Sequence, residues 1–163
     1  MENNNIRPAL SFGLFITVGI IGVALAFHYY LGFKACSLCM VETALFIMLS
    51  GVLLVALMHN PKAWSRRVYG LLLSLISFSG VIVAGRHSWF EKTLKDQTPQ
   101  CKPLLETWMN DFSVTETIHR LLNVYDGCSE ISFTILSLTI PELISIIFLV
   151  FLTYSLRLLL LAR

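Results

Sequence analysis

Residues 9–27 read ALSFGLFITVGIIGVALAF, an apolar run without a charged side chain. A helix needs about 20 predominantly apolar residues to cross a hydrocarbon core of roughly 30 Å. The run continues to Tyr30 and so reaches this length. It therefore predicts a helix that crosses a membrane.

Three further apolar runs are long enough to cross a membrane, and the four predicted spans cover about residues 9–30, 40–58, 68–85 and 140–161. The 163 residues are 56% hydrophobic and 13% charged, with a mean hydropathy of +0.74, whereas about a quarter of a soluble domain is charged. We expect an all-α integral membrane protein in a lipid bilayer, built as one four-transmembrane-helix bundle over residues 1–163. Nothing in the composition indicates a nucleic-acid partner.

The first run also has features of a cleaved signal peptide. Arg7 precedes it, and Ala24-Leu25-Ala26 has the small-x-small form of a cleavage site. The run is longer than the apolar region of a usual signal peptide, so we expect it to be the first span.

Basic residues predict the orientation. The turn between the second and third spans, HNPKAWSRR at residues 59–67, carries three Lys or Arg and no acid, which indicates the cytoplasmic side. Four spans place both termini on that side. The loops at about 31–39 and 87–139 then face outward, and the longer one has seven acids against four Lys or Arg.

All four cysteines, Cys36, Cys39, Cys101 and Cys128, lie in these two outer loops. Cysteine is an ordinary packing residue in apolar helices, so a random scatter would have placed some there. Thiols on an oxidising side tend to form disulfides. Cys39 falls in the first turn of the second span, where the helix dipole favours a thiolate. Glu42 would oppose that thiolate if it came close.

Two capping boxes mark helix starts in the second loop. Ser113-Val114-Thr115-Glu116 precedes apolar residues at helical spacing and predicts a short amphipathic helix, which lies on the outer membrane surface or caps the bundle. Thr139-Ile140-Pro141-Glu142 predicts the start of the fourth span. The spans should pack through small residues, namely Gly70, Ser74, Gly80, Ala44 and Gly51.

Four outward cysteines are compatible with three kinds of protein. The first is a redox protein in which two cysteine pairs exchange electrons. The second is a structural zinc protein, but the spacing C-x2-C-x61-C-x26-C lacks the second short knuckle of such sites, and we assign no metal ligands. The third is a membrane transporter or assembly protein stabilised by disulfides without redox turnover.

Particular motifs, in order along the whole chain, resemble the DsbB family of membrane disulfide bond formation proteins. They are ACSLC (35–39), GRHSWFE (85–91), Cys101, and DGCSEISFTILSLTIPE (126–142). The resemblance implies a protein-disulfide:quinone oxidoreductase in the bacterial inner membrane, with its cysteine loops in the periplasm.

The resemblance also implies a route for the electrons. A reduced periplasmic thiol oxidase of the DsbA type would attack a Cys101–Cys128 disulfide and form a mixed disulfide with Cys101. Cys128 would then engage Cys36, which leaves Cys39 as a thiolate facing a quinone from the membrane pool, either ubiquinone or menaquinone.

One position departs from the family pattern. Members usually carry an arginine four residues after the second cysteine of the C-x-x-C, and this chain has Thr43 there. Arg86 and His87, after the third span, are candidates to supply the missing donor or charge. The resemblance thus predicts a quinone site at Cys39, Thr43, Arg86 and His87, whereas His28 is expected at the membrane interface.

Overall fold

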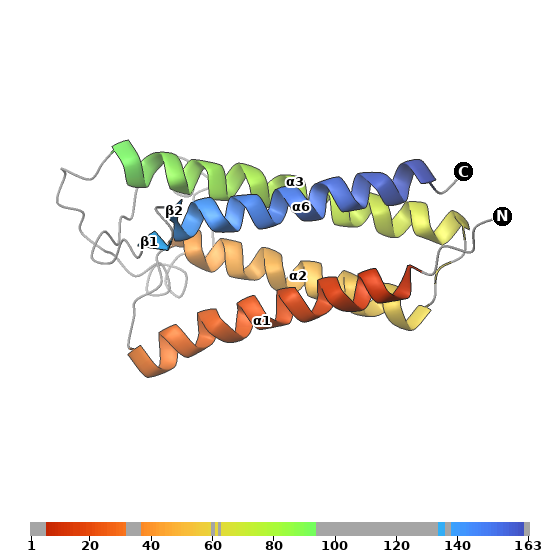
Figure 1. The fold of residues 1–163 in the computed structure, drawn as a ribbon, viewed down its shortest axis with the longest axis horizontal. Coiled ribbons are helices and arrows are strands. Elements are labelled where there is room, and N and C mark those ends of the chain that lie inside the picture. The colour runs from red at the N-terminus through yellow and green to blue at the C-terminus, as the bar shows by residue number, and fades with distance from the viewer. Residues whose placement is uncertain are drawn as a thin grey trace, which may run out of the picture.

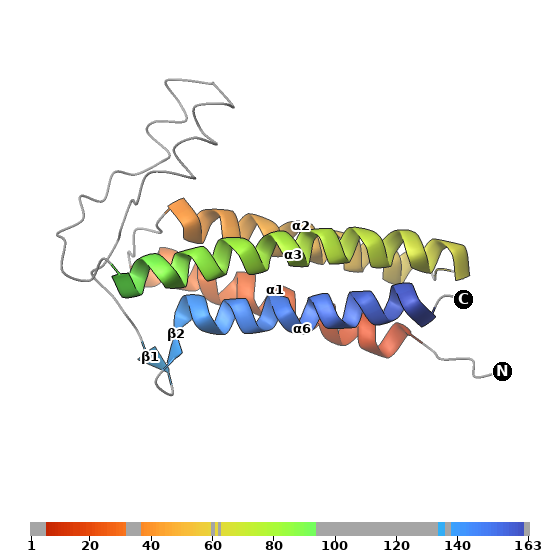
Figure 2. The ribbon, with the colours of Figure 1, turned by 90° about the horizontal axis from the view of Figure 1, so that it is seen from above.

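The computed structural model describes residues 6–31, 37–59, 61, 63–93, 134–135 and 138–161. These residues contain four helices, α1 (Arg7–Leu31), α2 (Ser37–His59), α3 (Ala63–Thr93) and α6 (Ile140–Leu161). Each is long and apolar enough to cross a membrane, and Figures 1 and 2 show them side by side along one direction. The predicted all-α four-helix bundle is confirmed. The short helix predicted after Ser113 lies outside the described residues.

One end of the bundle gathers the parts of interest. The last turns of α1 and α3 lie there, together with the first turns of α2 and α6 (Figure 1). Two short strands, β1 (Thr134–Ile135) and β2 (Leu138–Thr139), pair antiparallel and lead into α6. We call this the Cys39 end, because Cys39 lies in the first turn of α2 as predicted.

Helix α3 is longer than the apolar run that predicted it. Its 31 residues correspond to about 46 Å at 1.5 Å per residue, against roughly 30 Å of hydrocarbon. The predicted range of 68–85 marked only the apolar part, and neither Gly nor Pro interrupts RHSWFEKT at 86–93. His87, predicted to begin the outer loop, therefore lies inside α3.

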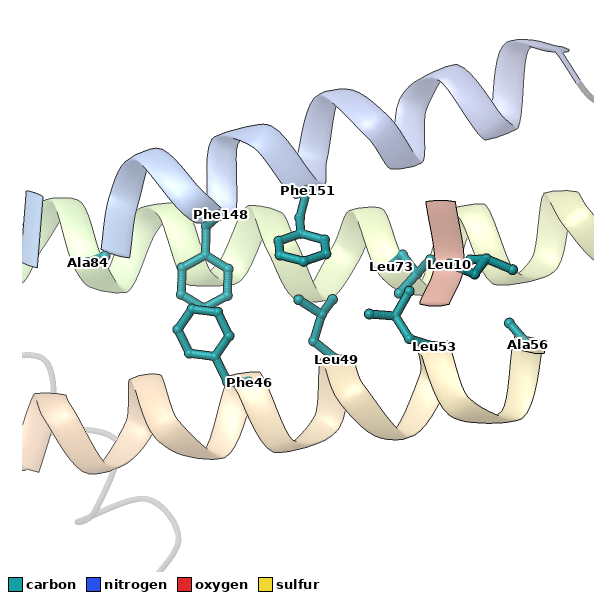
Figure 3. Packing of buried hydrophobic residues seen from close by; sticks show 9 residues of the cluster. All are labelled: Leu10, Phe46, Leu49, Leu53, Ala56, Leu73, Ala84, Phe148 and Phe151. Atoms are coloured by element: carbon teal, nitrogen blue, oxygen red, sulfur yellow. The ribbon is translucent and has the colours of Figure 1, made fainter. Parts of the chain in front are cut away.

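Aromatic and aliphatic side chains fill the centre of the bundle. Figure 3 shows Phe148 of α6 directly over Phe46 of α2, and their rings stack with centroids 4.4 Å apart and an interplanar angle of 20°. Helices α3 and α6 make the most extensive contact, while α1 packs mainly on α2. The buried apolar residues are Leu10, Phe46, Leu49, Leu53, Ala56, Leu73, Ala84, Phe148 and Phe151.

The small residues predicted to pack do so on α3 but not on α2. Gly70, Ser74 and Gly80 are buried as predicted, and the two glycines lie against side chains of α6. Ala44 and Gly51 are exposed, so the prediction that α2 packs through them is wrong. The buried positions of α2 are instead Glu42, Phe46, Leu49, Leu53 and Ala56, which recur every three or four residues along one face.

Gly80 provides a test of this packing. A Cβ atom at residue 80 would overlap the ring of Phe148, whereas a Cβ at Gly51 would meet nothing within 4 Å. We predict that Gly80→Ala lowers the free energy of unfolding by about 1–3 kcal/mol, the usual cost of overpacking. Gly51→Ala is the matched control and should leave stability unchanged or raise it. Loss of helical circular dichroism in mixed micelles measures both, and equal stability of the two variants would contradict the packing described.

Candidate functional site

The first turns of α2 bring three side chains to the Cys39 end. Cys39 and Glu42 are three residues apart and so share one face of the helix. The Thr43 hydroxyl donates a hydrogen bond to the carbonyl oxygen of Cys39, at 2.9 Å. Cys39 and Thr43 are half-buried, whereas Glu42 is only 2% exposed.

Helix α3 contributes His87 to the same place. Its Nδ1 lies 2.9 Å from Oε1 of Glu42, although the two residues are 45 positions apart in the chain. The His87 side chain is 15% exposed. With the proton on Nδ1, the imidazole donates to the carboxylate, so a buried acid gains the partner that it needs.

The cysteine sulfur lies beside this pair. One ligand-type atom each from Cys39, Glu42 and His87 can be chosen so that all three lie within 4.8 Å of one another. A carboxylate alone would repel a thiolate at this range, but a protonated imidazole hydrogen-bonded to it supplies the opposite charge. When His87 is protonated, it offsets the opposition expected between Glu42 and Cys39; when it is neutral, the repulsion between the two anionic side chains remains.

Of the remaining predicted residues, the structure describes Arg86 and His28 but none of the other three cysteines. Arg86 is half-buried on α3, one residue before His87. Cys36, Cys101 and Cys128 lie outside the described residues, so their predicted roles stay predictions. His28 is exposed near the end of α1, where its ring meets that of Tyr29 edge to face at 5.8 Å.

Glu42 was not predicted to belong to this site; we expected it only to oppose the Cys39 thiolate. A signal was available, because an ionisable side chain in a membrane-spanning segment marks a functional site by default. No pattern in the sequence indicated which side chain would pair with Glu42. His87 was a candidate for quinone binding, but only the packing of α2 against α3 brings it to Glu42.

A second polar cluster ties α3 to α6 at the same end. Lys92 of α3 forms an ion pair with Glu142 of α6. Glu142 also accepts a hydrogen bond from the backbone N–H of Thr139, at 2.8 Å. This is the contact from Glu to the cap residue expected of the predicted capping box. The ion pair links the last turn of α3 to the first turn of α6, and because Lys92 is 61% exposed it stabilises this contact only weakly.

Comparison with known proteins gives a consistent result. Residues 6–158 match the model of a family described as "Disulfide bond formation protein DsbB". "Disulfide bond formation protein B" of Nitrosococcus oceani is 32% identical over 137 residues, which cover 84% of this chain and 81% of that protein. "Disulfide bond formation protein B 1" of Pseudomonas aeruginosa is 32% identical over 138 residues, 85% of each chain. The protein of the same description from Chromobacterium violaceum, "Disulfide bond formation protein B", is 33% identical over 130 residues, 80% of this chain and 78% of its own length.

The contact between Glu42 and His87 can be tested by a double-mutant cycle. Glu42→Ala leaves a buried nitrogen without its acceptor, which costs about 1–3 kcal/mol of unfolding free energy. We predict that Glu42→Ala and His87→Ala together cost less than the sum of the two, with a coupling of about 0.5–3 kcal/mol. The control pairs Glu42→Ala with His28→Ala, on another helix and exposed, and should be additive. An additive result for Glu42 and His87 would contradict the contact.

Proposed function

This chain belongs to the DsbB family of disulfide bond formation proteins, and we propose that it reoxidises a periplasmic DsbA-type thiol oxidase and passes the electrons to a membrane quinone. The supporting observation is the place of Cys39. Its sulfur lies in the first turn of a membrane-spanning helix and within reach of the Glu42–His87 pair. At this boundary a protein substrate arrives from water and an oxidant from the lipid.

The proposed thiol chemistry uses two cysteine pairs, as the family resemblance implies. A thiolate of the reduced partner attacks the Cys101 sulfur of a Cys101–Cys128 disulfide and releases Cys128 as a thiolate. Cys128 attacks Cys36 of a Cys36–Cys39 disulfide, and Cys39 leaves as a thiolate. The second partner thiolate then attacks the partner sulfur bound to Cys101, so the partner departs as a disulfide. Cys101, released as a thiolate, attacks Cys128 of the Cys36–Cys128 disulfide, which re-forms Cys101–Cys128 and frees Cys36. Cys36 and Cys39 are then both thiolates, so two electrons have reached the membrane pair.

The residues around Cys39 fit a quinone head group, which is a planar ring with two carbonyl acceptors. His87, Arg86 and the Thr43 hydroxyl are half-buried polar groups at the Cys39 end, and imidazole and guanidinium N–H groups donate to carbonyl oxygens. Met40, one residue beyond Cys39, is 39% exposed and offers apolar surface. A bound quinone supplies the acceptor for two electrons and two protons.

The Glu42–His87 pair has two tasks in this scheme. Glu42 accepts a hydrogen bond from Nδ1–H of His87 and so fixes the orientation of the imidazole. A protonated His87 stabilises the Cys39 thiolate as it forms, and the same imidazole can release a proton at the site where reduction requires one.

The distribution of charge supports a periplasmic Cys39 end. Arg66 and Arg67 lie near the start of α3, at the opposite end of the bundle from Cys39 (Figure 1). Arg66 Nε donates to the carbonyl of Pro61 in that turn, at 3.2 Å. By the positive-inside rule this turn is cytoplasmic. We therefore propose that the protein lies in the bacterial inner membrane with both termini in the cytoplasm.

The function is tested by quinone reduction, followed by absorbance, with purified protein, a reduced DsbA-type partner and either ubiquinone or menaquinone. We predict that turnover falls to background in Cys39→Ser and in Cys101→Ser, because each removes one sulfur of the electron path. His28→Gln is the control and should turn over at the parent rate. Turnover retained by Cys39→Ser would contradict the path, and inactivity of the parent with both quinones would favour disulfides that only stabilise the fold.

Thr43 supplies a further prediction. An arginine there adds a positive charge beside Cys39, so Thr43→Arg should lower the apparent KM for quinone by about tenfold, equivalent to ~1.4 kcal/mol. Thr43→Met, of similar length but uncharged, is the matched control and should not lower it. An unchanged KM in Thr43→Arg would show that another group already fills this role.

A further inference from the structure

We propose that Cys39, Glu42 and His87 form a binding site for a thiophilic divalent cation, represented by Zn²⁺, and that the ion captures the Cys39 thiolate. The three residues offer a sulfur, a carboxylate oxygen and an imidazole nitrogen, all of which are common zinc ligands. Their ligand atoms lie within 4.8 Å of one another. This site is distinct from a site made of four cysteines, because it uses only one.

The geometry requires little adjustment. Bonds of about 2.0–2.3 Å from a tetrahedral zinc ion place its ligand atoms roughly 3.5 Å apart. Nδ1 of His87 and Oε1 of Glu42 are 2.9 Å apart, and the sulfur of Cys39 lies within 4.8 Å of a ring nitrogen of His87 and of a carboxylate oxygen of Glu42. Small rotations of the three side chains are enough to surround one ion.

The backbone already holds the ligands together. Cys39 and Glu42 share one face of α2, and α3 packs against α2 and carries His87. Each ligand is therefore supplied by a helix rather than by a flexible loop, which reduces the entropy lost on binding. Three protein ligands leave a fourth position of the tetrahedron for water.

The charge balance favours the cation. A thiolate and the Glu42 carboxylate carry two negative charges in a place where Glu42 is only 2% exposed. Like charges repel strongly where water is excluded. A divalent cation neutralises both charges, with neutral His87 as the third ligand. Binding releases the thiol proton, and if His87 is protonated it releases that proton as well.

The inference rests on the proposed function in one respect, since the ion and a Cys36–Cys39 disulfide would compete for the same sulfur. The cation binds the thiolate state and not the disulfide. Zn²⁺ would then act as a reversible inhibitor that holds the site in its reduced form until a chelator removes the ion.

The test isolates this sulfur. The full chain with Cys36→Ser, Cys101→Ser and Cys128→Ser keeps Cys39 as its one thiol and is titrated in detergent with Co²⁺, a spectroscopic substitute for Zn²⁺. We expect one equivalent to bind, with a thiolate-to-cobalt charge-transfer band and the visible bands of tetrahedral cobalt. Zn²⁺ should displace the cobalt and abolish both.

Single substitutions in this one-thiol protein identify the other ligands. His87→Gln and Glu42→Gln should each weaken binding at least tenfold, and Cys39→Ser should remove the charge-transfer band. His28→Gln, a histidine at the same end of the bundle, is the matched control and should bind as the parent does. Circular dichroism checks that each variant is helical, and His87→Gln decides the matter if Glu42→Gln does not fold.

Two results would overturn the site. One is the absence of a charge-transfer band in the one-thiol protein. The other is unchanged affinity in both His87→Gln and Glu42→Gln, which would mean that the ion binds Cys39 without them. The titration needs neither the thiol-oxidase partner nor the quinone. If the one-thiol protein does not bind cobalt while the unmodified protein reduces quinone, the metal site is refuted and the oxidase function is not. If the one-thiol protein binds cobalt while the unmodified protein does not reduce quinone, the oxidase function is refuted and the metal site is not.

Discussion

The hydrogen bond between Glu42 and His87 is the constraint on which the rest of the site depends. A carboxylate that is 2% exposed in a membrane-spanning helix is costly unless a partner satisfies it. His87 meets this need from α3, and the contact fixes the relative rotation of α2 and α3 at the Cys39 end. Cys39, one turn before Glu42, is thereby placed beside an acid–base pair and not beside lipid alone.

The helix packing keeps that contact in place. Toward the middle of the bundle, the stacked rings of Phe46 and Phe148 join α2 to α6, and Gly80 allows α3 to approach the Phe148 ring. At the Cys39 end, Lys92 and Glu142 join α3 to α6. Helix α3 therefore contacts α6 at two places and contacts α2 through His87 and Glu42. His87 accordingly has a defined position on a packed helix.

Much of the fold follows from single runs of sequence. Long apolar stretches predicted the four spans, and the Thr139-to-Glu142 pattern predicted the start of α6, because each depends on neighbours within one helix. The pairing of Glu42 with His87 depends on two helices 45 residues apart, and no local pattern contains that information. The wrong prediction that α2 packs through Ala44 and Gly51 has the same cause. A small side chain allows a neighbouring helix to come close, but it does not show which face of α2 turns toward the other helices.

The central claim is that electrons pass from a protein dithiol through Cys39 to a quinone. The most direct measurement mixes the unmodified protein with reduced DsbA-type partner and excess quinone without oxygen, and counts both products. Because a dithiol releases two electrons, the account predicts one quinol for each partner disulfide formed. Partner oxidation without a matching amount of quinol, or no oxidation at all, would contradict it.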